Sequence, residues 1–144
     1  MFSKACQYGI KATLHIAEQS SQGKRVSLKG IAKAIDSPEA FTAKILQLLA
    51  KNNIVNSIKG PSGGFEIAES DLDNIRLIQI VTAIDGDQIF NGCGLGLKKC
   101  DENNPCPVHE KFKSVRDDLK NMLATTNIRE LAAGLNAGNT YLRV

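Results

Sequence analysis

Residues 37–64 read SPEAFTAKILQLLAKNNIVNSIKGPSGG, and they carry the clearest structural signals in the chain. Ser37 is a good N-cap and Pro38 suits the first helical position, so a helix is predicted from here to about Asn52. The spacing of its apolar residues predicts an inner stripe made of Phe41, Ile45, Leu48 and Leu49. The outer face is then expected to carry Ala40, Thr42, Ala43, Lys44, Gln47 and Lys51.

A β-hairpin is predicted directly after this helix. Residues 54–59 have the composition of a short strand, and residues 65–68 alternate as a returning strand does. The glycine-rich residues 60–64 between them must turn sharply and form an extended tip.

Two helices are predicted upstream of this stretch. Ser3 can cap a helix over residues 3–19, and Ser27 can cap a shorter helix with apolar residues up to Ile35. Two short helices joined by a tight turn and followed by a glycine-rich hairpin are typical of a winged helix-turn-helix.

The C-terminal half is also mainly helical. A helix over residues 74–85 is expected to end at Gly86, and Pro107 is expected to begin a long helix that runs to about Ala124. Asn127 and Glu130 resemble a capping box for a last short helix through Ala133. The long helix carries apolar residues spaced 4-3-4-3, a coiled-coil-like seam, at Val108, Phe112, Val115, Leu119 and Met122.

The predicted fold is therefore mainly α with a small β-hairpin wing: a winged helix-turn-helix plus a long C-terminal dimerisation helix. We expect a DNA-binding region at residues 1–70, a dimerisation and sensor region at 71–135, and a tail at 136–144.

The bulk composition is that of a globular protein, with 42% apolar and 23% charged residues in a chain of 144. No apolar run approaches the roughly 20 residues that span a bilayer, and the first residues lack the pattern of a signal peptide. A cytoplasmic protein without a membrane partner is expected.

The net charge of +3 is distributed unevenly. Residues 1–65 hold nine basic and three acidic side chains, so this segment carries +6 and the remainder carries −3. A basic half that contains a helix-turn-helix favours double-stranded DNA as the partner.

Nine residues are the candidates for DNA contact. Thr42, Lys44 and Gln47 are expected to reach base edges in the major groove, and Lys29 and Lys51 are better placed for phosphates. The slim hairpin tip suits the minor groove, and its candidates are Lys59, Pro61, Ser62 and Gly63.

Three of the four cysteines lie close together, at Cys93, Cys100 and Cys106, with His109 three residues further on. Three thiolates and an imidazole suit an iron–sulfur cluster, tetrahedral zinc, or, without metal, reversible thiol oxidation. Cys6 and His15 are interpreted as packed helical residues rather than ligands.

Four stretches resemble the Rrf2 family of bacterial transcriptional regulators. They are Lys4 to Ala12, the helix Phe41 to Leu49, the wing Ser57 to Phe65, and Ile80 to Gly86. The resemblance implies a homodimer with crossed C-terminal helices, bound to a roughly palindromic operator, and we expect a repressor.

The same resemblance bears on the cofactor. Cluster-binding members of the family carry three cysteines in the corresponding loop, and His109 matches the fourth ligand of a [2Fe–2S] type. Another type takes an acidic ligand near the N-terminus, where this chain has Gln7. A [2Fe–2S] cluster is therefore favoured over [4Fe–4S], with zinc as the alternative.

An enzyme is not expected. No catalytic triad or carboxylate pair stands out, and Gly60 to Gly64 lacks the Lys-Ser/Thr of a phosphate-binding loop. No small-molecule substrate is expected either. The remaining alternatives are a metal-free thiol redox regulator and a DNA-binding protein with a structural zinc site.

Overall fold

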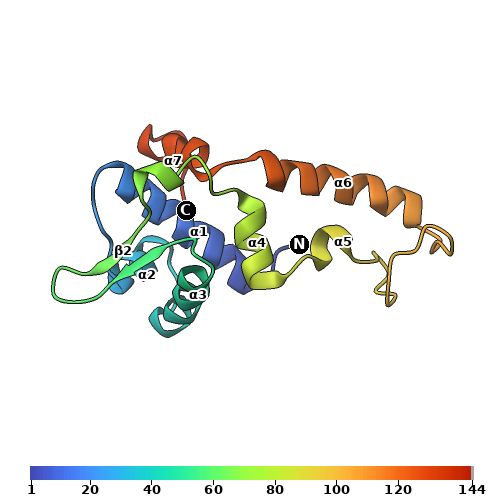
Figure 1. Ribbon diagram of the computed structural model, residues 1–144, viewed down its shortest axis with the longest axis horizontal. Coiled ribbons are helices and arrows are strands. Elements are labelled where there is room, and N and C mark those ends of the chain that lie inside the picture. The colour runs from blue at the N-terminus through green and yellow to red at the C-terminus, as the bar shows by residue number, and fades with distance from the viewer. Residues whose placement is uncertain (144) are drawn as a thin grey trace.

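A computed structural model describes residues 1–143 (Figure 1). The elements follow the order α1 (Lys4–Ser21), α2 (Leu28–Ala34), α3 (Glu39–Lys51), β1 (Asn56–Ile58), β2 (Gly64–Glu66), the 3-10 helix η1 (Glu69–Asp71), α4 (Leu77–Asp85), α5 (Gln88–Asn91), α6 (His109–Thr125) and α7 (Ile128–Asn136). This is the expected fold class, mainly helical with one small antiparallel hairpin. Within residues 1–143, no helix is both long enough and apolar enough to cross a membrane.

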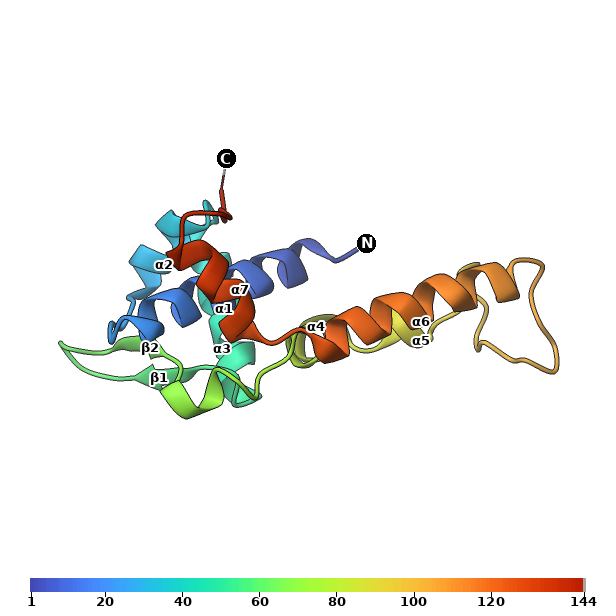
Figure 2. The same cartoon turned by 90° about the horizontal axis from the view of Figure 1, so that it is seen from above.

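The molecule has two visibly different parts (Figure 2). The head consists of residues 1–85 and 126–143, and α1 runs through it and packs against α2, α3, α4 and α7. The arm consists of residues 86–125, in which α5 and α6 lie side by side and extend away from the head. The two parts meet at α4, which packs against α1 and α3 on one side and α6 on the other.

The head forms because its helices bury apolar stripes and cap their own ends. The side-chain oxygens of Ser3 and Ser27 accept hydrogen bonds from the backbone N–H groups of Cys6 and Gly30, so both predicted caps are confirmed. Fully buried aliphatic residues of α1, α2 and α3, such as Ile16, Ile31 and Leu46, form one continuous core. This core continues into α4 and α7, so the helix-turn-helix does not have a separate core.

The prediction for α3 is partly wrong. Pro38 is the N-cap, and the hydroxyl of Ser37 instead contacts that of Thr42. Thr42 was expected to be exposed but has no exposed surface, because its hydroxyl also donates to the carbonyl of Pro38 at 2.7 Å. Leu46 is buried and Leu48 is 39% exposed, so the helix is rotated slightly from the predicted stripe.

The hairpin pairs Asn56 with Glu66, Ser57 with Phe65 and Ile58 with Gly64. Its tip requires glycine at two positions. A Cβ on Gly63 would lie 2.1 Å from the carbonyl oxygen of Ile58, and Gly64 has a φ of 139° with its own Cβ position 2.7 Å from the carbonyl oxygen of Val26. The strands are shorter than predicted because the outer residues have no partner across the ladder.

The arm holds the cysteines in an irregular segment, the cysteine loop (residues 92–108). Gly86 ends α4 as predicted, with a φ of 75°, but the short helix α5 was not predicted within the expected loop. In α6, His109 and Leu123 are buried, whereas Phe112, Val115 and Met122 are 42%, 61% and 43% exposed. Much of the predicted seam therefore faces outward in a single chain.

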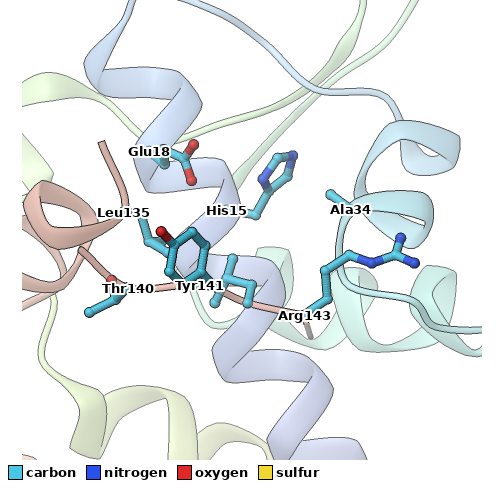
Figure 3. A pocket seen from close by; sticks show the side chains of 8 residues that line it. His15, Glu18, Ala34, Leu135, Thr140, Tyr141 and Arg143 are labelled. Atoms are coloured by element: carbon cyan, nitrogen blue, oxygen red, sulfur yellow. The ribbon is translucent and has the colours of Figure 1, made fainter. Parts of the chain in front are cut away.

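The tail folds back onto the head (Figure 3). Arg143 donates to the carbonyl of Lys33 at 2.9 Å, and Leu142 packs against the core. Tyr141 and Arg143 face His15 across a shallow hollow of about 200 Å³. Burial lowers the pKa of His15, in agreement with its interpretation as a packed residue. The last residue of the expected tail, Val144, lies outside the described residues.

Candidate DNA interface and cysteine site

The helix α3 is the second helix of the helix-turn-helix, called the recognition helix below, and it presents a polar, basic face. Lys44, Gln47 and Lys51 are exposed on α3, and Lys29 is exposed near the start of α2. Thr42 does not belong to this face, because it is buried and its hydroxyl braces the turn between α2 and α3. The face of α3 therefore offers one amide and two cations, and α2 adds a third cation, which suits base-edge and phosphate contacts of different kinds.

The wing tip is exposed and narrow. Lys59, Pro61 and Ser62 lie at the surface, and Gly63 is half-buried where its N–H donates to the carbonyl of Gly60 at 2.9 Å. These residues lie between the paired residues Ile58 and Gly64, at the end of the hairpin, where the sequence predicted them. Figure 1 shows this hairpin extending from the rest of the head.

Sequence reasoning missed the residue that braces this wing, Arg25. Its guanidinium donates to the carboxylate of Glu66 at 3.0 Å and to the carbonyl of Ser62 at 3.2 Å. The next residue, Val26, bridges to Phe65, which places Arg25 beside the hairpin. No local pattern links residues 41 positions apart, so this contact could not be predicted from the sequence.

A second basic group lies on α1. The ammonium groups of Lys4 and Lys11 lie 5.1 and 5.6 Å from the ring centre of Tyr8, and this ring packs edge-on against Phe41 of α3. These contacts hold two cations near the beginning of the recognition helix.

In the cysteine site, Cys100 and His109 are in direct contact. The Sγ of Cys100 lies 3.3 Å from Nδ1 of His109. His109 begins α6, and Cys100 reaches it from the cysteine loop.

Cys93 and Cys106 form a second pair. The N–H of Leu95 donates to the sulfur of Cys93 at 3.4 Å, and the N–H of Leu97 and the thiol of Cys106 also approach it. These hydrogen bonds lower the pKa of the Cys93 thiol, with the Leu95 contribution first. The four expected ligands thus lie as two donor pairs, and within residues 1–143 no three acidic, Cys or His side chains surround a single metal position.

Two nitrogens in this site have no protein partner. They are Nε2 of His109 and Nε of Arg116. In the part of the chain that the structure describes, every other buried side-chain nitrogen or oxygen atom has a hydrogen-bond partner. Buried polar atoms are rarely left unpaired, so these two nitrogens are available to a bound group. The donor set and the unpaired imidazole fit an iron–sulfur cluster or another metal centre.

Arg116 was not among the predicted site residues. Its guanidinium donates to Cys100 Sγ at 3.2 Å and to the carbonyl of Gly92. Arg116 follows His109 by seven residues, which is two helical turns, so both side chains lie on one face of α6. This spacing was a usable signal in the sequence.

Cys6 lies apart from this site, as predicted. It is fully buried in α1, and burial together with the charge of Asp85 raises the pKa of its thiol to about 12.

Comparison with known proteins agrees with this architecture. A protein of Aquifex aeolicus (strain VF5), provisionally named an HTH-type transcriptional regulator, is 31% identical over 133 residues, which cover 91% of this chain and 90% of that protein. The HTH-type transcriptional regulator IscR of Photorhabdus laumondii is 25% identical over 87% of this chain and 74% of its own. The solved structure of CymR, the global cysteine regulator of Bacillus subtilis, has a similar fold, with a TM-score of 0.76, 23% identity, and coverage of 92% of this chain and 96% of that one.

Residues 2–134 match the profile of the Rrf2 family, described as an iron-dependent transcriptional regulator. The match spans both the helix-turn-helix with its wing and the cysteine loop with α6. The chain therefore belongs to the Rrf2 family and is a DNA-binding transcriptional regulator, not an enzyme.

Proposed function

We propose that this regulator is a cytoplasmic homodimer that represses transcription from a palindromic operator and changes its DNA affinity with the state of an iron–sulfur cluster. Residues 1–70 would bind DNA, and residues 71–135 would dimerise and hold the cluster. Cys93, Cys100, Cys106 and His109 are the proposed ligands, and [2Fe–2S] is the favoured type.

The single observation that carries the cofactor proposal is the unpaired, buried Nε2 of His109, whose other ring nitrogen, Nδ1, contacts the Cys100 sulfur. An imidazole nitrogen in that situation is explained by a bound metal. The arrangement of donors as two pairs favours a centre with two irons, because zinc needs four donors around one ion. When bound, the cluster would supply a charge and a redox state that the protein can sense.

The exposed seam of α6 supports the dimer. Phe112, Val115 and Met122 form an apolar stripe at coiled-coil spacing, and an exposed stripe of this kind is typical of a protein interface. Two copies joined there would present two recognition helices, and a symmetric dimer matches a palindromic operator.

The fold offers a route from the cysteine site to the DNA interface. The cysteine loop rests on α6, α6 packs against α4, and α4 packs against both α1 and α3. The N–H of Ser3, at the start of α1, also donates to the carboxylate of Asp85 at the end of α4 at 3.1 Å. Ordering of the loop could therefore shift the position of the recognition helix.

The test begins with anaerobic purification, a visible absorption spectrum, and assays of iron and sulfide. Duplexes selected from a random DNA pool would then be titrated with cluster-loaded and cluster-free protein. We expect selection of a palindrome and at least a tenfold difference in affinity between the two states. Equal affinity of both states for every selected duplex would reject the switch.

Ligand variants sharpen the test. Cys106→Ala and His109→Ala should lose the visible absorption, whereas Cys6→Ala should keep it. Selected duplexes placed in a reporter promoter would show whether binding lowers transcription. A colourless protein that still selects DNA would indicate the zinc or the metal-free thiol alternative, and metal analysis would separate these two.

A further inference from the structure

Arg116 is a half-buried cation whose surroundings are unusual. In residues 1–143 the ion pairs involve Arg25, Lys99, Lys113 and Arg129, and none involves Arg116. A guanidinium stays charged at all ordinary pH values, and buried charges are normally compensated. The groups that its side chain does contact are the Cys100 sulfur and the carbonyl of Gly92.

The two contacts join separate points of the cysteine loop. Gly92 is the first residue of the loop, and Cys100 lies near its middle. Because Arg116 is in the middle of α6, one side chain ties both points to a rigid helix. The same sulfur contacts His109 two turns earlier, so Cys100 is held between the imidazole and the guanidinium.

We infer that Arg116 is a positioning residue of the cysteine site: it fixes the loop on α6 with Cys100 facing His109, and it compensates the negative charge of the loaded site. The charge compensation rests on the proposed cluster, whereas the positioning of the loop does not. The free Nε of Arg116 leaves one further donor for a negatively charged occupant. Hydrogen bonds and positive charge near cluster sulfurs favour the reduced, more negative state.

Lys113 provides a matched control. It also lies on α6 and also contacts the loop, through Glu102 at 3.1 Å, but its partner is an exposed carboxylate rather than a sulfur. Arg116→Met removes the charge and the donors while keeping an apolar stem, and Arg116→Lys keeps the charge without the two-pronged geometry. Lys113→Met removes a cation at a neighbouring place.

The first measurement is hydrogen exchange of the backbone amides of residues 93–100 in metal-free protein. We expect at least tenfold faster exchange in Arg116→Met, an intermediate rate in Arg116→Lys, and no change in Lys113→Met. Circular dichroism confirms that each variant is folded. Unchanged exchange in folded Arg116→Met would overturn the positioning role, whether or not the protein binds a cluster.

The second measurement is the reduction potential of the loaded protein, by dye-mediated titration. Arg116→Met should shift the one-electron equilibrium about tenfold toward the oxidised form, which corresponds to about 59 mV, and Arg116→Lys should recover part of the shift. An unshifted potential would overturn the charge role alone. If the wild-type protein bound no cluster while exchange still rose in Arg116→Met, the proposed function would fail but the positioning role would stand.

Discussion

The head and the arm bury their apolar residues to very different degrees. In the head, aliphatic side chains such as Ile16, Ile31 and Leu46 have no exposed surface. In the arm, Leu95, Leu97 and Val115 are all more than half exposed. The head therefore buries most of its apolar residues, in a core that also includes Phe90 and Leu123 of the arm. The rest of the arm presents apolar surface and unpaired polar atoms that a partner chain and a bound group would satisfy.

Because of this difference, substitutions in the interior of the head should affect stability, and substitutions in the arm should affect binding. The head needs its interior to fold, and the DNA contacts proposed for it lie on the outside. The arm has little interior of its own, and its seam and cysteine loop are suited to binding. Changes in the two parts are therefore expected to have effects of different kinds.

Leu46→Ala should have the largest effect on folding. Leu46 is fully buried in α3, so the loss of its side chain leaves a cavity and should cost about 2–5 kcal/mol of unfolding free energy. Leu97→Ala, in the exposed part of the arm, is the control and should stay within about 0.5 kcal/mol of the wild type. Urea denaturation at one protein concentration measures both. Equal costs for the two variants would contradict the distinction between head and arm.

Val115→Glu should break the dimer without unfolding the head. Pairing would place a carboxylate from each copy in an apolar seam, so the dimer dissociation constant should rise roughly 100-fold, which is about 2.7 kcal/mol. Sedimentation analysis across a concentration series measures this constant.

Asn121→Glu is the matched control for that variant. Asn121 is exposed on α6, on a side of the helix away from the seam, so the same new charge should leave the dimer intact. If Val115→Glu and Asn121→Glu dimerised alike, the seam would not be the interface.

Lys59→Gln should weaken DNA binding without affecting either fold or dimer. The wing tip is exposed, and loss of one phosphate contact should lower operator affinity by up to roughly tenfold at 0.1 M salt. The slope of log affinity against log salt concentration should fall by about 0.9. Lys111→Gln removes an equal charge from the arm and should leave the slope unchanged. An identical slope for all three proteins would remove Lys59 from the interface.

The parts of the fold that could be predicted are those specified by local pattern. Ser3 and Ser27 cap their helices as expected, and the glycine-rich tip forms the predicted hairpin. The errors came from contacts between distant or differently oriented side chains. Thr42 has a polar side chain that periodicity alone could not place, and it is buried because Ser37 and Pro38 supply its hydrogen bonds.

In the candidate sites too, residues close together in the sequence could be predicted and contacts between distant residues could not. Spacing in the sequence grouped Cys93, Cys100, Cys106 and His109 because they lie in one short segment, and their joint role as ligands stays a prediction. Of this group, Cys100 and His109 are in direct contact, and in residues 1–143 no three such side chains surround one metal position. Arg25 was missed because its partner Glu66 is remote in sequence, and Arg116 because its partners are a backbone carbonyl and a sulfur. The contact of Arg25 leaves no local signal, whereas the two-turn spacing of His109 and Arg116 was a signal that could have been used.

The four cysteines should differ in their rate of reaction with iodoacetamide. The three cysteines of the arm should react faster than Cys6 in the head. With a pKa of about 12, about one in ten thousand Cys6 side chains is a thiolate at pH 8, whereas an ordinary thiol is about one-quarter ionised. In metal-free protein, Cys93 should be alkylated readily, since hydrogen bonds to its sulfur lower its pKa. Raising the pH from 7 to 9 should accelerate labelling in the loop and leave Cys6 unlabelled, and peptide mass spectrometry assigns each site.

Denaturant supplies the control, because in urea Cys6 should react as the loop cysteines do. Labelling of Cys6 in the native protein at the rate of the loop would mean that the first turn of α1 opens easily. That turn is held by the Ser3 cap and by the contact of Ser3 with Asp85 at the end of α4, so easy opening would also weaken the proposed route from arm to recognition helix. Protection of Cys6 beside reactive loop thiols would instead support a rigid head that transmits changes in the arm.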